Sequence, residues 1–70
     1  MTYRLFYTDV RAPKATYEAQ KPLLIPRAYS NLDDALGMAR QIKARGGIAW
    51  EIECPDGTII DRDEIDKLLR

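Results

Sequence analysis

Histidine is absent from the sequence, and cysteine occurs once, at Cys54. A disulfide within the chain is therefore excluded. Zinc fingers, Cys/His nucleophile pairs, Ser-His-Asp triads and haem bound through histidine are excluded as well, because each lacks a necessary residue. We expect no cofactor and no bound metal ion.

Long apolar segments are also missing, and no apolar run is longer than Leu23-Leu24-Ile25. A membrane-spanning helix needs about 20 consecutive apolar residues, so a transmembrane segment is not expected. The first residues, Met1 to Arg4, lack the apolar stretch of a secretory signal. We therefore expect a cytoplasmic protein without a membrane partner.

The chain offers little material for a hydrophobic core, because it has 70 residues. A chain of this size buries about 60% of its extended surface, which favours one domain over residues 1–70 and association with a partner. Its 11 basic and 11 acidic side chains cancel, but residues 1–29 carry +3 and residues 30–70 carry −3. Solvated surface charge explains this asymmetry, and orientation of a partner is the alternative.

The N-terminal part shows strand patterns at two places. The residues from Tyr3 to Val10 are rich in strand-forming types and alternate in side-chain character, which predicts a strand. Residues 11–22 contain prolines and no periodicity, so we expect an exposed, flexible loop. Leu23–Ile25 lies between Pro22 and Pro26 and fits a short edge strand, because proline offers no hydrogen-bond donor to a sheet.

A long helix is predicted after Ser30, whose side chain is placed to accept a hydrogen bond from the Asp33 amide. Acidic residues near its start and basic residues near its end match the helix dipole. Gly46-Gly47 is expected to end the helix by supplying a left-handed residue. The apolar residues at helical spacing are Leu32, Ala35, Leu36, Ala39 and Ile42.

A hairpin is predicted next. Residues 48–54 alternate in polarity and predict a half-buried strand. Its expected inward side chains are Ile48, Trp50, Ile52 and Cys54, and its expected outward side chains are Ala49, Glu51 and Glu53. Pro55-Asp56-Gly57 is typical of a turn, after which Thr58–Ile60 returns as the partner strand.

The C-terminal residues predict a short helix capped near Asp61, with Ile60 packing on Ile65 as a hydrophobic staple. Its apolar stripe consists of Ile65, Leu68 and Leu69. Together, the elements predict an α+β fold. This fold is a small three- or four-stranded, mainly antiparallel sheet with one long helix packed on it and a short C-terminal helix.

Several motifs between Ser30 and Ile65 carry a family resemblance. They are Leu32-Asp33-Asp34-Ala35, Ala39-Arg40-Gln41-Ile42, Gly46-Gly47, the strand through Trp50 and Ile52, and Asp56-Gly57-Thr58-Ile59-Ile60. This region resembles small uncharacterised bacterial domains with a β-β-α-β-β plan. The resemblance implies a fold alone, because that family has no established activity or site to transfer.

Three groups of residues suggest chemistry, and each also has a structural explanation. Cys54 has no histidine to activate it, and its neighbour Glu53 would raise the thiol pKa. The acidic run Asp61–Glu64 is too short for an EF-hand calcium loop and is explained by helix capping. Glu51 and Glu53 fit the solvent face of a strand, where charge discourages aggregation. We therefore expect no catalytic residues and a protein that is not an enzyme.

Basic and aromatic residues gather in the N-terminal part and form the one candidate binding set. Beside Phe6 it comprises Tyr3, Arg4, Arg11, Lys14, Tyr17, Lys21, Arg27 and Tyr29. Tyrosine and arginine are enriched at protein interfaces, so we expect a small binding module for a protein partner or a second copy of itself. Single-stranded nucleic acid, held by base stacking and phosphate neutralisation, is the alternative partner.

The exposed backbone of the expected edge strand, Leu23–Ile25, is where a second copy would add a strand. The predicted loop over residues 11–22 either carries the contact or serves only as a spacer. The sequence leaves these two roles open.

Overall fold

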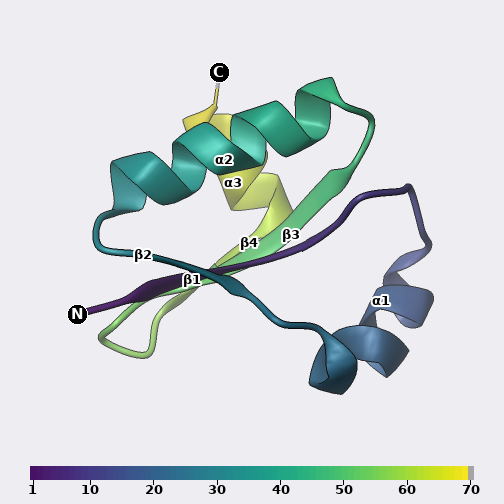
Figure 1. Ribbon diagram of the computed structural model, residues 1–70, viewed down its shortest axis with the longest axis horizontal. Helices are drawn as coiled ribbons and strands as arrows, with labels where there is room; N and C mark the ends of the chain where they lie inside the picture. The colour runs from purple at the N-terminus through teal and green to yellow at the C-terminus, as the bar shows by residue number, and fades with distance from the viewer. Residues whose placement is uncertain (70) are drawn as a thin grey trace.

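The fold is a four-stranded antiparallel sheet with helices on both faces (Figure 1). A computed structural model describes residues 1–69. Its elements are β1 (Tyr3–Thr8), α1 (Lys14–Gln20), a 3-10 turn (Lys21–Leu23), β2 (Arg27–Tyr29), α2 (Leu32–Ala44), β3 (Ile48–Glu53), β4 (Ile59–Asp61) and α3 (Arg62–Leu68). The strand order is β2-β1-β3-β4. The predicted α+β fold, with one long helix on the sheet and a short C-terminal helix, is confirmed.

The main core lies between the sheet and the pair α2 and α3. Leu5 and Ile52 are opposite each other on the two central strands, and both are completely buried. Ala35 and Ala39 lie one turn apart on α2, and their small side chains allow the helix to approach the sheet closely. The buried residues of this core are Leu5, Ala35, Ala39, Ile42, Ala49, Ile52 and Ile65.

The helix ends follow the expected capping chemistry, with one correction. Asn31, not Ser30, caps α2, and its Oδ1 accepts from the Asp34 amide at 2.8 Å. The helix therefore begins one residue later than predicted, because asparagine provides the same acceptor. Asp61 caps α3 as predicted and accepts from the Glu64 amide at 2.9 Å. Among residues 1–69, no helix combines the length and apolar character needed to cross a bilayer.

The prediction of an edge strand at Leu23–Ile25 is wrong. The edge strand is β2, which begins after Pro26 and pairs with β1 through Tyr3↔Tyr29, Arg4↔Ala28 and Leu5↔Arg27. Pro26 lacks an amide hydrogen, so regular pairing starts only beyond it.

The segment expected to be a loop over residues 11–22 is largely helical, which corrects that prediction. It forms α1 and the 3-10 turn, and Tyr17 is 4% exposed. Tyr17 is the only residue of α1 that is buried, so the segment has an anchor but no repeating apolar stripe. A seven-residue helix with a single buried position gives no detectable periodicity in the sequence.

A β-bulge changes the expected alternation in β3. Phe6 pairs with Glu51, but Tyr7 pairs with Ala49, so Trp50 is the extra residue between two register positions. In such a bulge the extra residue and its neighbour share one side of the strand. Trp50 and Glu51 accordingly lie on the α1 face, whereas Ala49 faces α2. The prediction that Glu51 points away from Trp50 is therefore wrong.

The turn between α2 and β3 generates a stability prediction. A Cβ atom at Gly47 would lie 2.6 Å from the Thr8 carbonyl oxygen and 2.8 Å from Ile42 Cγ2. At Gly37, inside α2, a Cβ atom would meet no heavy atom within 4 Å. We expect Gly47→Ala to destabilise the fold by about 1 to 3 kcal/mol through overpacking. Gly37→Ala is expected to stabilise it by about 0.5 to 1 kcal/mol. Urea unfolding measures both, and equal effects of the two substitutions would contradict the packing described for Gly47.

Candidate functional site

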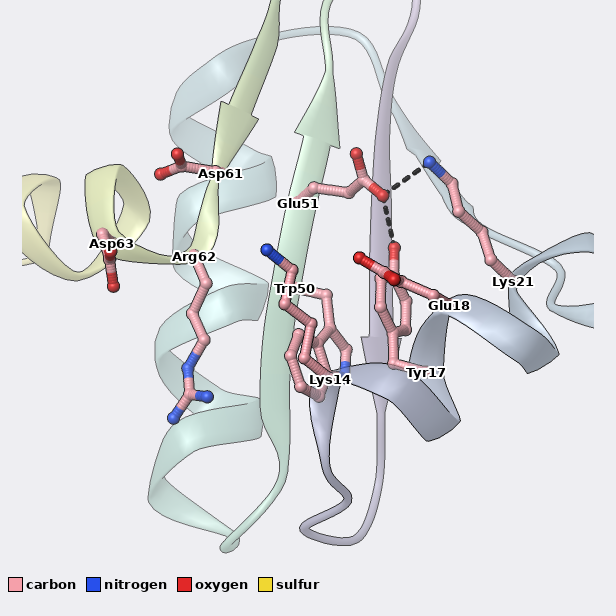
Figure 2. Close-up of a pocket in the computed structure, with 9 residues that line it drawn as sticks. All are labelled: Lys14, Tyr17, Glu18, Lys21, Trp50, Glu51, Asp61, Arg62 and Asp63. Atoms are coloured by element: carbon pink, nitrogen blue, oxygen red, sulfur yellow. Dashed lines mark hydrogen bonds and ion pairs between the residues drawn. The ribbon is translucent and has the colours of Figure 1, made fainter.

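Helix α1 is attached to the sheet by an aromatic stack. The rings of Tyr17 and Trp50 lie with their centroids 4.5 Å apart and their planes 8° from parallel. Figure 2 shows this stack beneath the groove between α1 and α3. The two rings belong to a second, smaller core on the α1 face, formed by Phe6, Tyr17, Ile48 and Trp50 with Leu24 packed against it.

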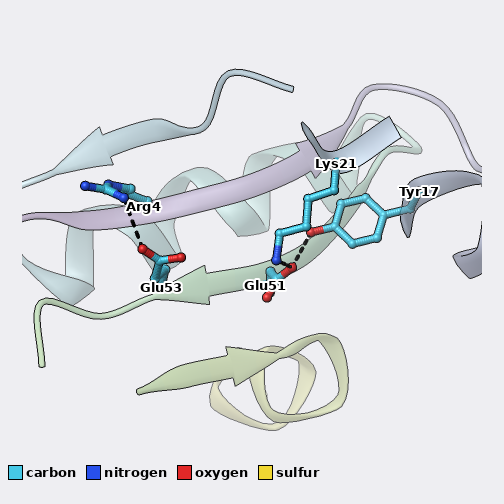
Figure 3. A network of polar contacts seen from close by, with 5 residues as sticks. All are labelled: Arg4, Tyr17, Lys21, Glu51 and Glu53. Atoms are coloured by element: carbon cyan, nitrogen blue, oxygen red, sulfur yellow. Dashed lines mark hydrogen bonds and ion pairs between the residues drawn. The ribbon is translucent and has the colours of Figure 1, made fainter. Parts of the chain in front are cut away.

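The carboxylate of Glu51 connects α1 to the sheet a second time. Tyr17 Oη donates to Glu51 Oε1 at 2.5 Å, and Lys21 Nζ lies 2.6 Å from the same oxygen (Figure 3). Lys21 Nζ also lies 5.0 Å from the centre of the Phe6 ring, close enough for a cation–π contact. Tyr17 and Lys21 are one helical turn apart, so both reach one acceptor.

These contacts keep the protonation states of both groups fixed near neutral pH. Burial, followed by the hydrogen bond to Glu51, raises the pKa of Tyr17 far above its ordinary value. Burial alone would raise the pKa of Glu51, but the hydrogen bonds from Lys21 and Tyr17 outweigh it and lower this pKa. A tyrosine that stays protonated and a glutamate that stays ionised are poor general acids and bases, because neither pKa is near 7. The geometry makes this cluster an attachment point for α1.

A charged groove of about 470 Å³ lies beside this cluster, between α1 and α3. Its wall from α3 includes Arg62, whose guanidinium carbon lies 5.4 Å from the centre of the Trp50 ring. The lining residues are Lys14, Tyr17, Glu18, Lys21, Trp50, Glu51, Asp61, Arg62 and Asp63. Within residues 1–69, no three acidic or cysteine side chains are grouped so that they could hold a metal ion.

Glu53 and Cys54 are the other residues that were considered for chemistry, and neither has an environment that would activate it. Glu53 forms an ion pair with Arg4 at 3.1 Å, so the two glutamates of β3 have different cationic partners. Cys54 is half-buried, and desolvation together with Asp56 raises its thiol pKa. A raised pKa reduces the thiolate fraction and with it the nucleophilicity of the sulfur.

The structure does not gather the predicted binding set on one face. Tyr3 and Tyr29 pack against the main core, on the face opposite α1. Phe6 and Tyr17 are buried in the smaller core, so the aromatic rings form no open stacking platform. The basic members are spread over four parts of the chain, with Arg4 on β1, Arg11 after β1, Lys14 and Lys21 along α1 and its end, and Arg27 on β2.

Trp50, Glu51 and Arg62 contribute to the grooves but were not in the predicted set. Strict alternation predicts Trp50 in the main core and Glu51 in solvent. Because of the bulge, both side chains lie on the face of the sheet that α1 covers. Arg62 comes from the opposite end of the chain, and no local pattern connects it with Trp50.

A second, more apolar groove of about 480 Å³ runs along the end of β1 beside α1 and the approach to β2. Two of its apolar side chains are freely exposed, Val10 at 71% and Ile25 at 89%, and Leu23, close by in the sequence, is 84% exposed. The groove is lined by Tyr7, Thr8, Asp9, Val10, Ala12, Thr16, Gln20, Leu24 and Ile25. Exposed apolar side chains that gather in one place are typical of an interaction surface.

Comparisons of the chain with protein-family models, with curated proteins and with solved structures each give no match. The resemblance of residues 30–65 to small bacterial domains therefore stays a prediction. Functional inference depends on the grooves and edges described above.

The aromatic attachment of α1 can be tested with two substitutions at one position. Tyr17→Ala removes the stack and leaves a cavity, which is expected to destabilise the fold by about 3 kcal/mol. Tyr17→Phe keeps the stack and removes only the hydrogen bond to Glu51, with an expected loss of about 1 kcal/mol. Chemical denaturation measures both values. Equal losses for the two variants would show that the ring stack does not hold α1.

The Glu51 carboxylate generates a pH prediction. Because its pKa is lowered in the folded chain, it adds stability above the unfolded glutamate pKa of about 4.3. This contribution is lost as the pH falls through the lower, folded pKa. We expect Glu51→Gln to flatten the decline in unfolding free energy between about pH 6 and 3. Glu53→Gln, on the same strand and in a more exposed ion pair, is the matched control. The same flattening in both variants would contradict the assignment to Glu51.

Proposed function

We propose that the protein is a protein-binding module that pairs with a second copy of itself along the edge of β2. The observation that carries this proposal is the exposure of Leu23 and Ile25 beside an edge strand. Neither side chain contributes to either core among residues 1–69. Burial of such side chains in an interface is a favourable source of binding free energy.

The β2 edge is suited to a two-fold antiparallel pair. Within the described chain, β2 is hydrogen-bonded only to β1, so its other side is available to a further strand. A two-fold axis at Ala28 would place Arg27 opposite Tyr29 of the second copy. This arrangement opposes no two like charges, and the small Ala28 side chains lie at the axis.

Prolines on the approach to β2 limit the length of the proposed pairing. Pro22 and Pro26 flank the exposed Leu23 and Ile25 and offer no amide hydrogen to a second strand. Backbone pairing is then confined to β2, while the apolar side chains that precede Pro26 pack across the interface. The formal net charge of zero adds no overall repulsion between two copies.

Sedimentation equilibrium of purified full-length chain tests the proposal. We expect a reversible dimer, and Ile25→Asp is expected to raise its dissociation constant at least about tenfold. Ile59→Asp is the matched control, because Ile59 is 51% exposed on β4, at the opposite edge of the sheet. A chain that remains monomeric to about 1 mM would contradict the proposal. A dimer weakened by Ile59→Asp and unaffected by Ile25→Asp would contradict it too.

A further inference from the structure

Two arginines that are far apart in the sequence line grooves beside the start of β3. Arg11 follows β1 and Arg62 begins α3, yet both line the same two neighbouring grooves. The larger groove, of about 340 Å³, is lined by Arg11, Ala12, Pro13, Ile48 and Arg62. We call it the arginine groove. It is separate from the more apolar groove at the end of β1, with which it shares only Ala12.

Neither arginine has an acidic partner within residues 1–69. The ion pairs of this part of the chain involve Arg4, Lys21 and Lys43. Asp66 is the one acid that lines the smaller of the two grooves, and Lys43 Nζ already lies 2.8 Å from its Oδ1. Arg11 and Arg62 therefore line the same two grooves, and neither forms an ion pair with an acidic side chain of residues 1–69.

One contact restrains the exposed side chain of Arg62. Its guanidinium lies over the ring of Trp50, and this cation–π contact restricts a side chain that would otherwise sample many rotamers. Asp61 and Asp63 line the charged groove, not the arginine groove. Asp61 also accepts a hydrogen bond from the Glu64 amide, which holds its carboxylate at the start of α3.

The arginine groove combines this charge with an apolar wall made of Ala12, Pro13 and Ile48. Guanidinium groups bind carboxylate and phosphate oxygens through paired hydrogen bonds, and an anion between two of them removes their mutual repulsion. We propose that the arginine groove binds an oxyanion attached to an apolar group. Arg11 and Arg62 hold the oxyanion, and the apolar group lies against Ile48.

Amide chemical shifts of the isotope-labelled full-length chain test this site with phenyl phosphate, benzoate, inorganic phosphate and benzyl alcohol as probes. We expect saturable shifts at Arg11, Ala12, Ile48 and Arg62 with phenyl phosphate or benzoate. The tighter of these two probes identifies phosphate or carboxylate as the preferred group. Inorganic phosphate is expected to bind about tenfold more weakly, because it makes no apolar contact.

Substitutions distinguish specific binding in the arginine groove from general electrostatic attraction to the protein. Arg11→Gln and Arg62→Gln are each expected to weaken the binding of phenyl phosphate about tenfold. Arg40→Gln removes the same charge from an exposed position on α2 and is expected to leave binding unchanged. Arg11 lies outside helices and strands, so its variant tests the site even if Arg62→Gln perturbs α3.

Three results would overturn the proposal. The first is the absence of saturable shifts at about 10 mM phenyl phosphate. The second is an equal loss of binding in Arg40→Gln and Arg11→Gln. The third is equally tight binding of benzyl alcohol, which would show an apolar cavity without anion recognition.

Discussion

One extra residue in β3 determines what each face of the sheet presents. With strict alternation, Trp50 would share a face with Ile52, and Glu51 would lie on the other side. The bulge instead places Trp50 and Glu51 together on the α1 face and leaves Ile52 in the main core. Tyr17 can then stack on the indole and donate to the carboxylate at once. The attachment of α1, and with it one wall of both large grooves, depends on this local change of register.

The predictable part of the fold is the part stabilised by local chemistry. Helix α2 combines a regular apolar stripe with acidic residues at its start, and its end at Gly46 has the expected positive φ of 87°. Gly57 likewise has a φ of 90° in the predicted hairpin turn. In each case the signal and the structure it specifies lie within a few residues of each other, so a single sequence suffices.

The unpredictable part is stabilised by contacts between distant residues. Tyr17 reaches Glu51, and Arg62 reaches Trp50, through the tertiary arrangement of three different elements. A bulge leaves no signature of its own in β3, because every residue of that strand is compatible with regular alternation. The candidate binding set failed to form one surface for the same reason. Composition gives the residue types, but the fold assigned Tyr29 to one face and Tyr17 to the other.

The position of β1 in the sheet has a consequence for biosynthesis. β1 is made before both strands that it pairs with, because it is an interior strand with β2 on one side and β3 on the other. The hydrogen bonds between β1 and β3 can form only after residues 48–53 have been synthesised. The chain between the two strands must then close a long loop. Until then, the nascent chain carries the apolar Leu5 and Phe6 on a strand with one edge unpaired. An unpaired strand edge is open to pairing with other strands, so the order of synthesis exposes β1 to mispairing during that interval.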